Sequence, residues 1–255
     1  MSVSVPVLVL VVLAATASPE GSPTSQGPAR EQKAPPAADR GDDELVVPVL
    51  PARRLTAAMP EPPPPLPPGA EGVQPLTLEV RVTTRAGARA QTRAQTVTRS
   101  VDRVHVATAT GVEWLFERNP VDSRRVAATA VQHAEKTIVV YSESDLRMAL
   151  GIPGWAHVLT MGVDAHAVTS AGTGEARTLA GLRFLKARVA AGDRGRTLWW
   201  NADQLLPLEV AAGGNGASLA VVKISPGAEP ARLWSPEIRF PGYRVVEFAD
   251  WLEEH

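Results

Sequence analysis

The stretch LTLEVRVT, residues 76–83, alternates apolar and polar side chains without an exception. Successive side chains of a β-strand point to opposite faces, so this pattern places one side of the strand in a core and the other in water. The apolar side consists of Leu76, Leu78, Val80 and Val82. The stretch therefore predicts a half-buried strand of an antiparallel sheet.

Further strands are expected downstream of this one. Strand-like runs follow at residues 95–98, 102–108, 112–117, 137–141, 178–190, 196–201, 206–211, 217–224 and 243–248. Two of the turns between them, GDRG at 192–195 and GGNG at 213–216, are short, and short connections join antiparallel neighbours. We expect a mainly β (α+β) fold, an antiparallel sheet of about eight or nine strands with short inserted helices.

The helical insertion is expected at about 143–162. Ser142 and Asp145 have capping-box spacing, and an apolar helix runs from there through Leu146 and Leu150 before Gly151 ends it. A second short helix could begin at Trp155. Two apolar helices that interrupt a sheet could form a lid or plug, or an ordinary connection that packs its apolar side on the core.

Composition divides the chain at residue 75. All twelve aromatic residues lie after position 113, whereas 15 of the 23 prolines lie between Pro19 and Pro75. Proline-rich segments form extended structure rather than a packed core. We expect a disordered proline-rich linker at 18–75 and an antiparallel β domain at 76–255. The PPPPLPP run at 62–68 could bind a proline-recognition module or act as a spacer, and the apolar stretch 45–55 could dock on the domain or a partner.

The first 17 residues indicate export. The apolar run at residues 5–17 is too short to span a bilayer as a helix, and it ends in Ala15-Thr16-Ala17, a pattern read by signal peptidases. No lysine or arginine precedes the run, which leaves an uncleaved anchor as an alternative to cleavage after Ala17. The chain has no cysteine, so disulfides and thiolate metal sites are excluded. We expect a periplasmic or secreted protein, peripheral to a membrane at most.

No catalytic motif or cofactor fingerprint is present, and we expect neither catalytic residues nor a cofactor. The five histidines form no pair at metal-ligand spacing, so no metal site is expected. The net charge of −1 argues against nucleic-acid binding, which requires clustered basic residues. Arg124 and Arg125 could contact a lipid phosphate or a partner's carboxylate, although a solvated loop is the favoured interpretation.

The order of elements resembles a known group. Early strands, inserted helices, the strand AGLRF at 180–184, a hairpin to LWW at 198–200 and the strand start LPLE at 206–209 are similar to the bacterial periplasmic LolA, LolB and RseB-like proteins. Related uncharacterised envelope families carry a glycine where this chain has Leu205. The resemblance covers residues 76–224. It implies a curved sheet or half-barrel with an apolar cavity on its concave face, partly closed by the helices, for acyl chains or a partner's peptide.

The resemblance suggests candidate ligand contacts among the large apolar residues. These are Trp114, Phe116, Leu146, Leu150, Trp155, Trp199 and Trp200. Trp199 and Trp200 are adjacent on a strand, so they must point to opposite faces. One could face the cavity while the other forms a contact surface, or both could simply belong to the core.

Three functions remain open from the sequence. The first is an exported, non-catalytic binding protein that holds a lipid, an acyl chain or a lipoprotein segment. The second is an envelope protein-protein interaction module, or a sensor-associated module, without a cavity. The third is an unrecognised hydrolase, which requires a cleft that joins His133, His157 or His166 to a carboxylate and a nucleophile.

Overall fold

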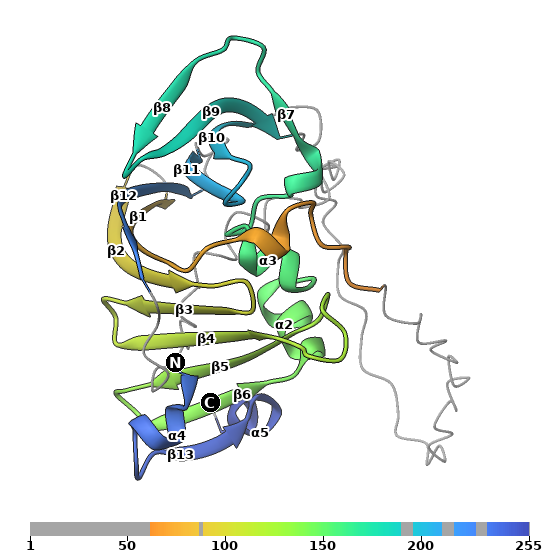
Figure 1. Ribbon diagram of the computed structural model, residues 1–255. Coiled ribbons are helices and arrows are strands. Elements are labelled where there is room, and N and C mark those ends of the chain that lie inside the picture. The colour runs from red at the N-terminus through yellow and green to blue at the C-terminus, as the bar shows by residue number, and fades with distance from the viewer. Residues whose placement is uncertain (1–61, 87–88, 190–195, 211–216, 228–233, 255) are drawn as a thin grey trace, which may run out of the picture. The chain divides into compact units, whose positions relative to one another are not determined.

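One open, curved sheet organises the computed structural model, which describes residues 62–86, 89–189, 196–210, 217–227 and 234–254 (Figure 1). The strand order is β13-β6-β5-β4-β3-β2-β1-β12-β11-β10-β9-β7, and β8 also pairs with β9. The predicted mainly β fold with short helices is confirmed. The predicted leader at 1–17 and residues 18–61 of the predicted linker lie outside the described residues.

The sheet has thirteen strands, more than the eight or nine expected. They are β1 (Leu76–Ala86), β2 (Arg89–Arg99), β3 (Arg103–Thr108), β4 (Val112–Arg118), β5 (Val126–Gln132), β6 (Thr137–Tyr141), β7 (Val168–Ser170), β8 (Ala176–Leu179), β9 (Leu182–Val189), β10 (Arg196–Asn201), β11 (Leu206–Val210), β12 (Ser218–Pro226) and β13 (Arg244–Glu247). The additional strands include β5, β7 and β8, whose sequences are rich in alanine or polar and lack the alternation that marks β1.

Almost every strand pair is antiparallel, as the short turns predict. The exception is β13, which pairs in parallel with β6, from Arg244 beside Thr137 to Glu247 beside Val140. A parallel neighbour requires a long crossover, and here the chain reaches β13 only after β12, which lies in another part of the sheet.

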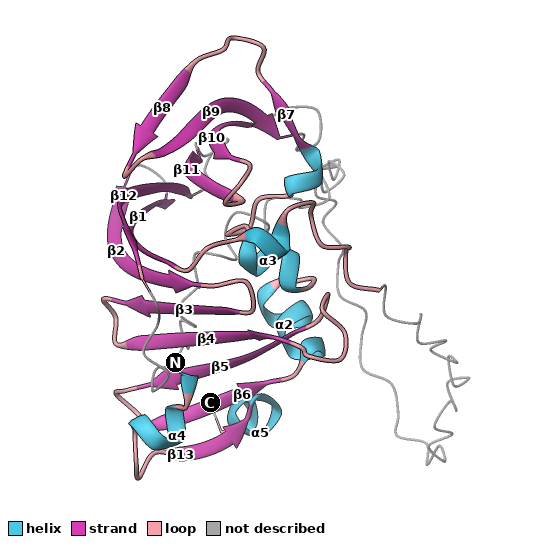
Figure 2. Cartoon of the chain, in the orientation of Figure 1, coloured by secondary structure: helices cyan, strands magenta, loops and turns pink. Residues whose placement is uncertain are grey.

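The two inserted helices lie where the sequence places them. Helix α2 (Glu143–Leu150) begins with a complete capping box, in which the Ser142 hydroxyl accepts from the Asp145 amide and the Asp145 carboxylate accepts from the Ser142 amide, and it ends at Gly151 with φ 64°. Helix α3 (Trp155–Leu159) follows. Both lie beside the sheet in Figure 2, where α2 contacts β5 and β6 and α3 contacts β4.

The remaining helices are short. They are the 3₁₀ turns η1 (Ala70–Gly72) and η2 (Ala165–Ala167), α4 (Pro236–Arg239) and α5 (Phe248–Glu253). In the part of the chain that the structure describes, no helix has both the length and the apolarity to cross a membrane.

The core lies mainly on one face of the sheet, which we call the inner face. Val80 and Val82 of β1 belong to it, together with Leu146 of α2 and Trp155 of α3, all of them fully or almost fully buried. A smaller cluster lies on the opposite, outer face, where Trp234 and its neighbours in the C-terminal segment cover Leu115, Val131 and Ile138.

Residues 63–75, assigned to the linker from composition, contact the domain, and we call them the strap. Pro63 and Pro67 are buried, and Ala70 and Val73 belong to the main core. A Cβ atom on Gly154 would lie 2.7 Å from the Arg124 carbonyl oxygen and 3.0 Å from Pro63 Cβ. Glycine is therefore required where the strap crosses the start of α3.

The strap is also fixed by polar contacts. Arg118 donates two hydrogen bonds to the Glu71 carboxylate, at 2.6 and 3.1 Å. The Gln74 backbone amide donates to the side-chain oxygen Oε1 of Gln204 at 3.0 Å. These contacts join the strap to β4 and to the turn between β10 and β11.

Candidate ligand-binding cavity

Trp199 and Trp200 lie on opposite faces of β10, as their adjacency requires. Trp200 is 8% exposed and borders a cavity. Trp199 is half-buried on the other face, where the Arg177 guanidinium lies 4.2 Å from its ring centroid. Arg177 also donates to Glu209 at 2.7 Å, so this tryptophan is covered by an ion pair of the sheet surface.

The cavity that Trp200 borders has a volume of about 520 Å³. Its apolar lining comes from the strap, η2, β7, β9, β10 and the turn at residues 202–205. These residues are Pro67, Pro68, Ala165, Val168, Leu185, Ala187, Trp200, Ala202 and Leu205, and the polar lining residues are Ser170, Arg183, Lys186, Asn201 and Asp203.

Strand register explains why these side chains share one face. Residues directly paired in neighbouring strands point to the same side of a sheet. A continuous row of such pairs runs across five strand pairs from the main core to β7, namely Val82, Leu219, Val210, Leu198, Ala187 and Ser170. The adjacent pair Leu185 and Trp200 lies on the same side. The cavity is therefore an unfilled extension of the inner face.

The turn at 202–205 forms one wall and is held from two directions. Asn201 donates to the Arg183 carbonyl at 2.8 Å and accepts from the Gln204 amide at 2.7 Å. Leu205 then adopts φ 47°, a left-handed conformation that favours glycine. The structure shows that leucine adopts it here.

Arg99, at the end of β2, fixes the turn at residues 202–205 through hydrogen bonds from its side chain. Its side chain is fully buried and donates to the carbonyl oxygens of Leu159 at 2.6 Å, of Leu205 at 3.3 Å and of Gln204. Burial lowers the pKa of Arg99 to about 9, so it remains charged at neutral pH. Arg99 is paired with Leu76 and therefore lies on the inner face, but the sequence alone does not distinguish it from Arg93, which lies on the same side of β2 and is exposed.

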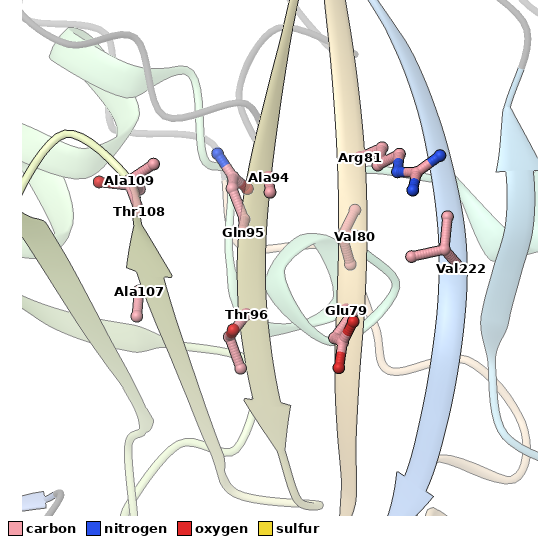
Figure 3. Close-up of a pocket in the computed structure, with 10 residues that line it drawn as sticks. All are labelled: Glu79, Val80, Arg81, Ala94, Gln95, Thr96, Ala107, Thr108, Ala109 and Val222. Carbon is pink, nitrogen blue, oxygen red and sulfur yellow. The ribbon is translucent and has the colours of Figure 1, made fainter.

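A second cavity, of about 450 Å³, lies on the outer face. Figure 3 shows Glu79, Thr96 and Ala107 side by side on three neighbouring strands, and Arg81 and Val222 beside them. Its lining combines alanine and valine side chains with an equal number of polar residues. It offers less apolar surface than the cavity at Trp200.

Five of the seven predicted ligand contacts are core residues. Trp114, Phe116, Leu146, Leu150 and Trp155 are at most 5% exposed, and none of them borders either of these two cavities. Trp114 stacks on Phe116 with ring centroids 5.8 Å apart, and the Trp155 indole donates to the Val101 carbonyl at 3.0 Å. Helices α2 and α3 thus pack as the ordinary connection described above, and their use as a lid stays a prediction.

Arg124 and Arg125 form intramolecular ion pairs. Arg124 Nε lies 3.1 Å from the Asp122 carboxylate, and Arg125 reaches both Asp122 at 3.3 Å and Glu143 at 3.4 Å. Hydrogen bonds from Arg124 lower the pKa of Asp122 to about 2. The structure accounts for both arginines as an exposed loop network, and binding of a phosphate by them stays a prediction.

A buried carboxylate on the outer face was not anticipated. Glu113 is 9% exposed and contacts His105 Nε2 at 2.8 Å, His133 Nε2 at 3.0 Å and Arg239 at 2.5 Å. Burial alone would raise the pKa of Glu113, but the hydrogen bonds from the two histidines and the charge of Arg239 outweigh it, and the pKa falls to about 2. His133 Nδ1 also lies 3.1 Å from the Tyr243 hydroxyl.

This cluster contains the carboxylate, histidine and hydroxyl that the hydrolase hypothesis requires. All three groups are engaged in attaching the C-terminal segment to β4 and β5, however, and neither of the two cavities includes them. Among the residues that the structure describes, no group of three or more histidine, aspartate or glutamate side chains is arranged so that it could hold a metal ion.

No family model and no curated protein matches this chain. Among solved structures, PNGF-II is similar with a TM-score of 0.42 and 10% identity, over 71% of this chain and 32% of that one, so this chain spans about a third of its length. A DUF1329 family protein from Desulfovibrio piger has a TM-score of 0.38 and 9% identity, over 67% and 93%. A LolA superfamily protein from Nitrosomonas europaea has a TM-score of 0.32 and 11% identity, over 66% and 94%.

Proposed function

We propose that the protein is an exported, non-catalytic binding protein that holds the apolar chain of a lipid or lipoprotein in the cavity bordered by Trp200. The observation that carries this proposal is Leu185, which lines the cavity and is 45% exposed although it is directly paired with the buried Trp200 of β10. An apolar chain that covers Leu185, Val168 and Trp200 removes apolar surface from water, and each Å² removed contributes about 25 cal/mol.

The construction of the cavity also favours a ligand. Its walls come from four segments that are distant in the sequence, and the turn wall is fixed by Asn201 and Arg99. Such a wall does not have to be ordered when the ligand binds, which lowers the entropic cost of binding. The apolar run and the A-x-A pattern at residues 5–17 support export to the periplasm or beyond.

The full chain can be tested with the neutral apolar dye N-phenyl-1-naphthylamine, whose fluorescence rises in apolar sites. We expect saturable binding that Leu185→Asp weakens at least tenfold, because a carboxylate in the cavity must be desolvated. Val222→Asp is the matched control, since Val222 is similarly exposed and borders the outer cavity. An absence of saturable binding, or an equal effect of both changes, would favour the interaction module instead.

A further inference from the structure

The cavity at Trp200 has two opposite charges at its border that pair with neither each other nor any other described residue. Arg183 lies on β9 and Asp203 lies in the turn that follows β10. Elsewhere on the sheet surface, charges are commonly paired, as in Arg177 with Glu209 at 2.7 Å and Lys186 with Glu175 at 2.9 Å. The charge of Lys186, the other basic residue of the lining, is therefore already compensated.

The two charges are attached to the same rigid wall. The Asn201 side chain bonds to the backbone of Arg183 on one side and of Gln204 on the other, and Asp203 lies between Asn201 and Gln204 in the sequence. Arg99 holds the same turn through the carbonyl oxygens of Gln204 and Leu205. The backbone positions of Arg183 and Asp203 relative to each other are thus set before a ligand arrives.

The volume limits the size of the apolar part. A methylene group is close in size to a water molecule, which occupies about 30 Å³. A cavity of about 520 Å³ therefore holds roughly 17 such groups, which corresponds to one acyl chain rather than two.

On the basis of the proposed function, we propose that the cavity selects single-chain lipids with a zwitterionic head group, a phosphate bound by Arg183 and a primary ammonium bound by Asp203. A guanidinium pairs with phosphate oxygens through two parallel hydrogen bonds. A primary ammonium offers three donors to a carboxylate. A purely anionic head group leaves Asp203 facing like charge, and a neutral one satisfies neither residue.

The test is displacement of N-phenyl-1-naphthylamine from the full chain by lipids with one lauroyl chain, each kept below its micelle-forming concentration. We expect lysophosphatidylethanolamine to displace the dye at concentrations about tenfold below monolauroylglycerol, with lysophosphatidic acid between them. Free phosphoethanolamine should displace nothing, because it lacks the chain. Raised salt should weaken the preference, since exposed charges are screened.

Variants of Arg183 and Asp203 test whether these two residues bind the head group. Arg183→Gln and Asp203→Asn should each reduce the affinity for lysophosphatidylethanolamine about fivefold, the effect of one exposed ion pair, and leave dye affinity unchanged. Matched controls are Arg81→Gln at the outer cavity and Asp250→Asn on α5, which should change neither value. If the dye binds and all head groups displace it equally, or if Asp203→Asn has no effect, the head-group proposal is wrong while the cavity stands. If the dye does not bind at all, the proposed function itself fails.

Discussion

The Arg99 guanidinium donates a hydrogen bond to the Leu159 carbonyl oxygen across 2.6 Å, and this contact joins the end of β2 to the end of α3 inside the core. The same side chain bonds to the Gln204 and Leu205 carbonyls. One buried cation therefore holds an inserted helix and the wall of the candidate cavity in fixed positions.

Replacing this residue should loosen both elements. Arg99→Met keeps the apolar stem but leaves three buried carbonyl oxygens without their donor, and we expect a loss of about 2 kcal/mol in the free energy of unfolding. Urea denaturation followed by far-UV circular dichroism measures it. Arg93→Met, at an exposed site of the same strand, should stay within about 0.5 kcal/mol of wild type. Equal effects of the two changes would contradict the role assigned to Arg99.

The left-handed backbone at residue 205 raises the question of whether glycine at this position would stabilise or destabilise the fold. Leu205→Gly relieves about 1 kcal/mol of backbone strain but removes a side chain that is 4% exposed, which costs about 2–5 kcal/mol. The net result should be a destabilisation. Ala180→Gly, at φ 50° and exposed, relieves the same strain without losing a buried group, and it should keep or raise the melting temperature. The account of this turn fails if Leu205→Gly is the more stable of the two.

Glu113 should make the protein sensitive to acid. The pKa of this carboxyl is about 2 in the folded chain, against an ordinary value of 4.5, so the unfolded state binds a proton first as the pH falls. The stabilisation is complete above about pH 4.5 and is lost as the pH drops through the folded value near 2, with an upper limit of about 3 kcal/mol. Free energies of unfolding measured at several pH values between 2 and 6 give the slope.

Glu113→Gln should make the free energy of unfolding depend less on pH between pH 2 and 6, and it should lower that free energy at neutral pH. Glu247→Gln, at an exposed position of β13, should stay within about 0.5 kcal/mol of wild type at neutral pH. If Glu113→Gln loses as much stability between pH 6 and pH 2 as wild type does, other carboxyl groups are responsible for the sensitivity to acid.

Trp155 should contribute to stability and not to ligand binding. Trp155→Phe removes the hydrogen bond to the Val101 carbonyl and part of a fully buried ring, which should cost about 1–3 kcal/mol. Dye affinity should not change, because Trp155 does not border the cavity. A selective loss of dye binding with unchanged stability would restore the lid interpretation of α3.

The local structure could be predicted from the sequence. Strict alternation predicted β1, and the spacing of Ser142, Asp145 and Gly151 predicted both ends of α2. The adjacency of Trp199 and Trp200 predicted their opposite faces. Each of these inferences depends only on the period of a strand or the caps of a helix, and both are local properties of the chain.

The remaining features depend on contacts between distant segments. The parallel pairing of β13 and the burial of Arg99 follow from where the chain returns after β12 and from which carbonyl groups meet at the end of β2. The predicted contacts Trp114 and Trp155 fill the core instead of a cavity, because apolar residues at core spacing and at ligand spacing are indistinguishable in one sequence. Leu185 could be found only from the pairing of β9 with β10.

The most direct test is native mass spectrometry of the full chain, produced in bacteria with residues 1–17 included and recovered without harsh detergent. The account predicts a reproducible additional mass, of the size of a single-chain lipid, that is present in wild type and Val222→Asp and is lost in Leu185→Asp. A bare mass in every sample, or an adduct that persists in Leu185→Asp, would contradict the claim that the cavity beside Trp200 holds the ligand.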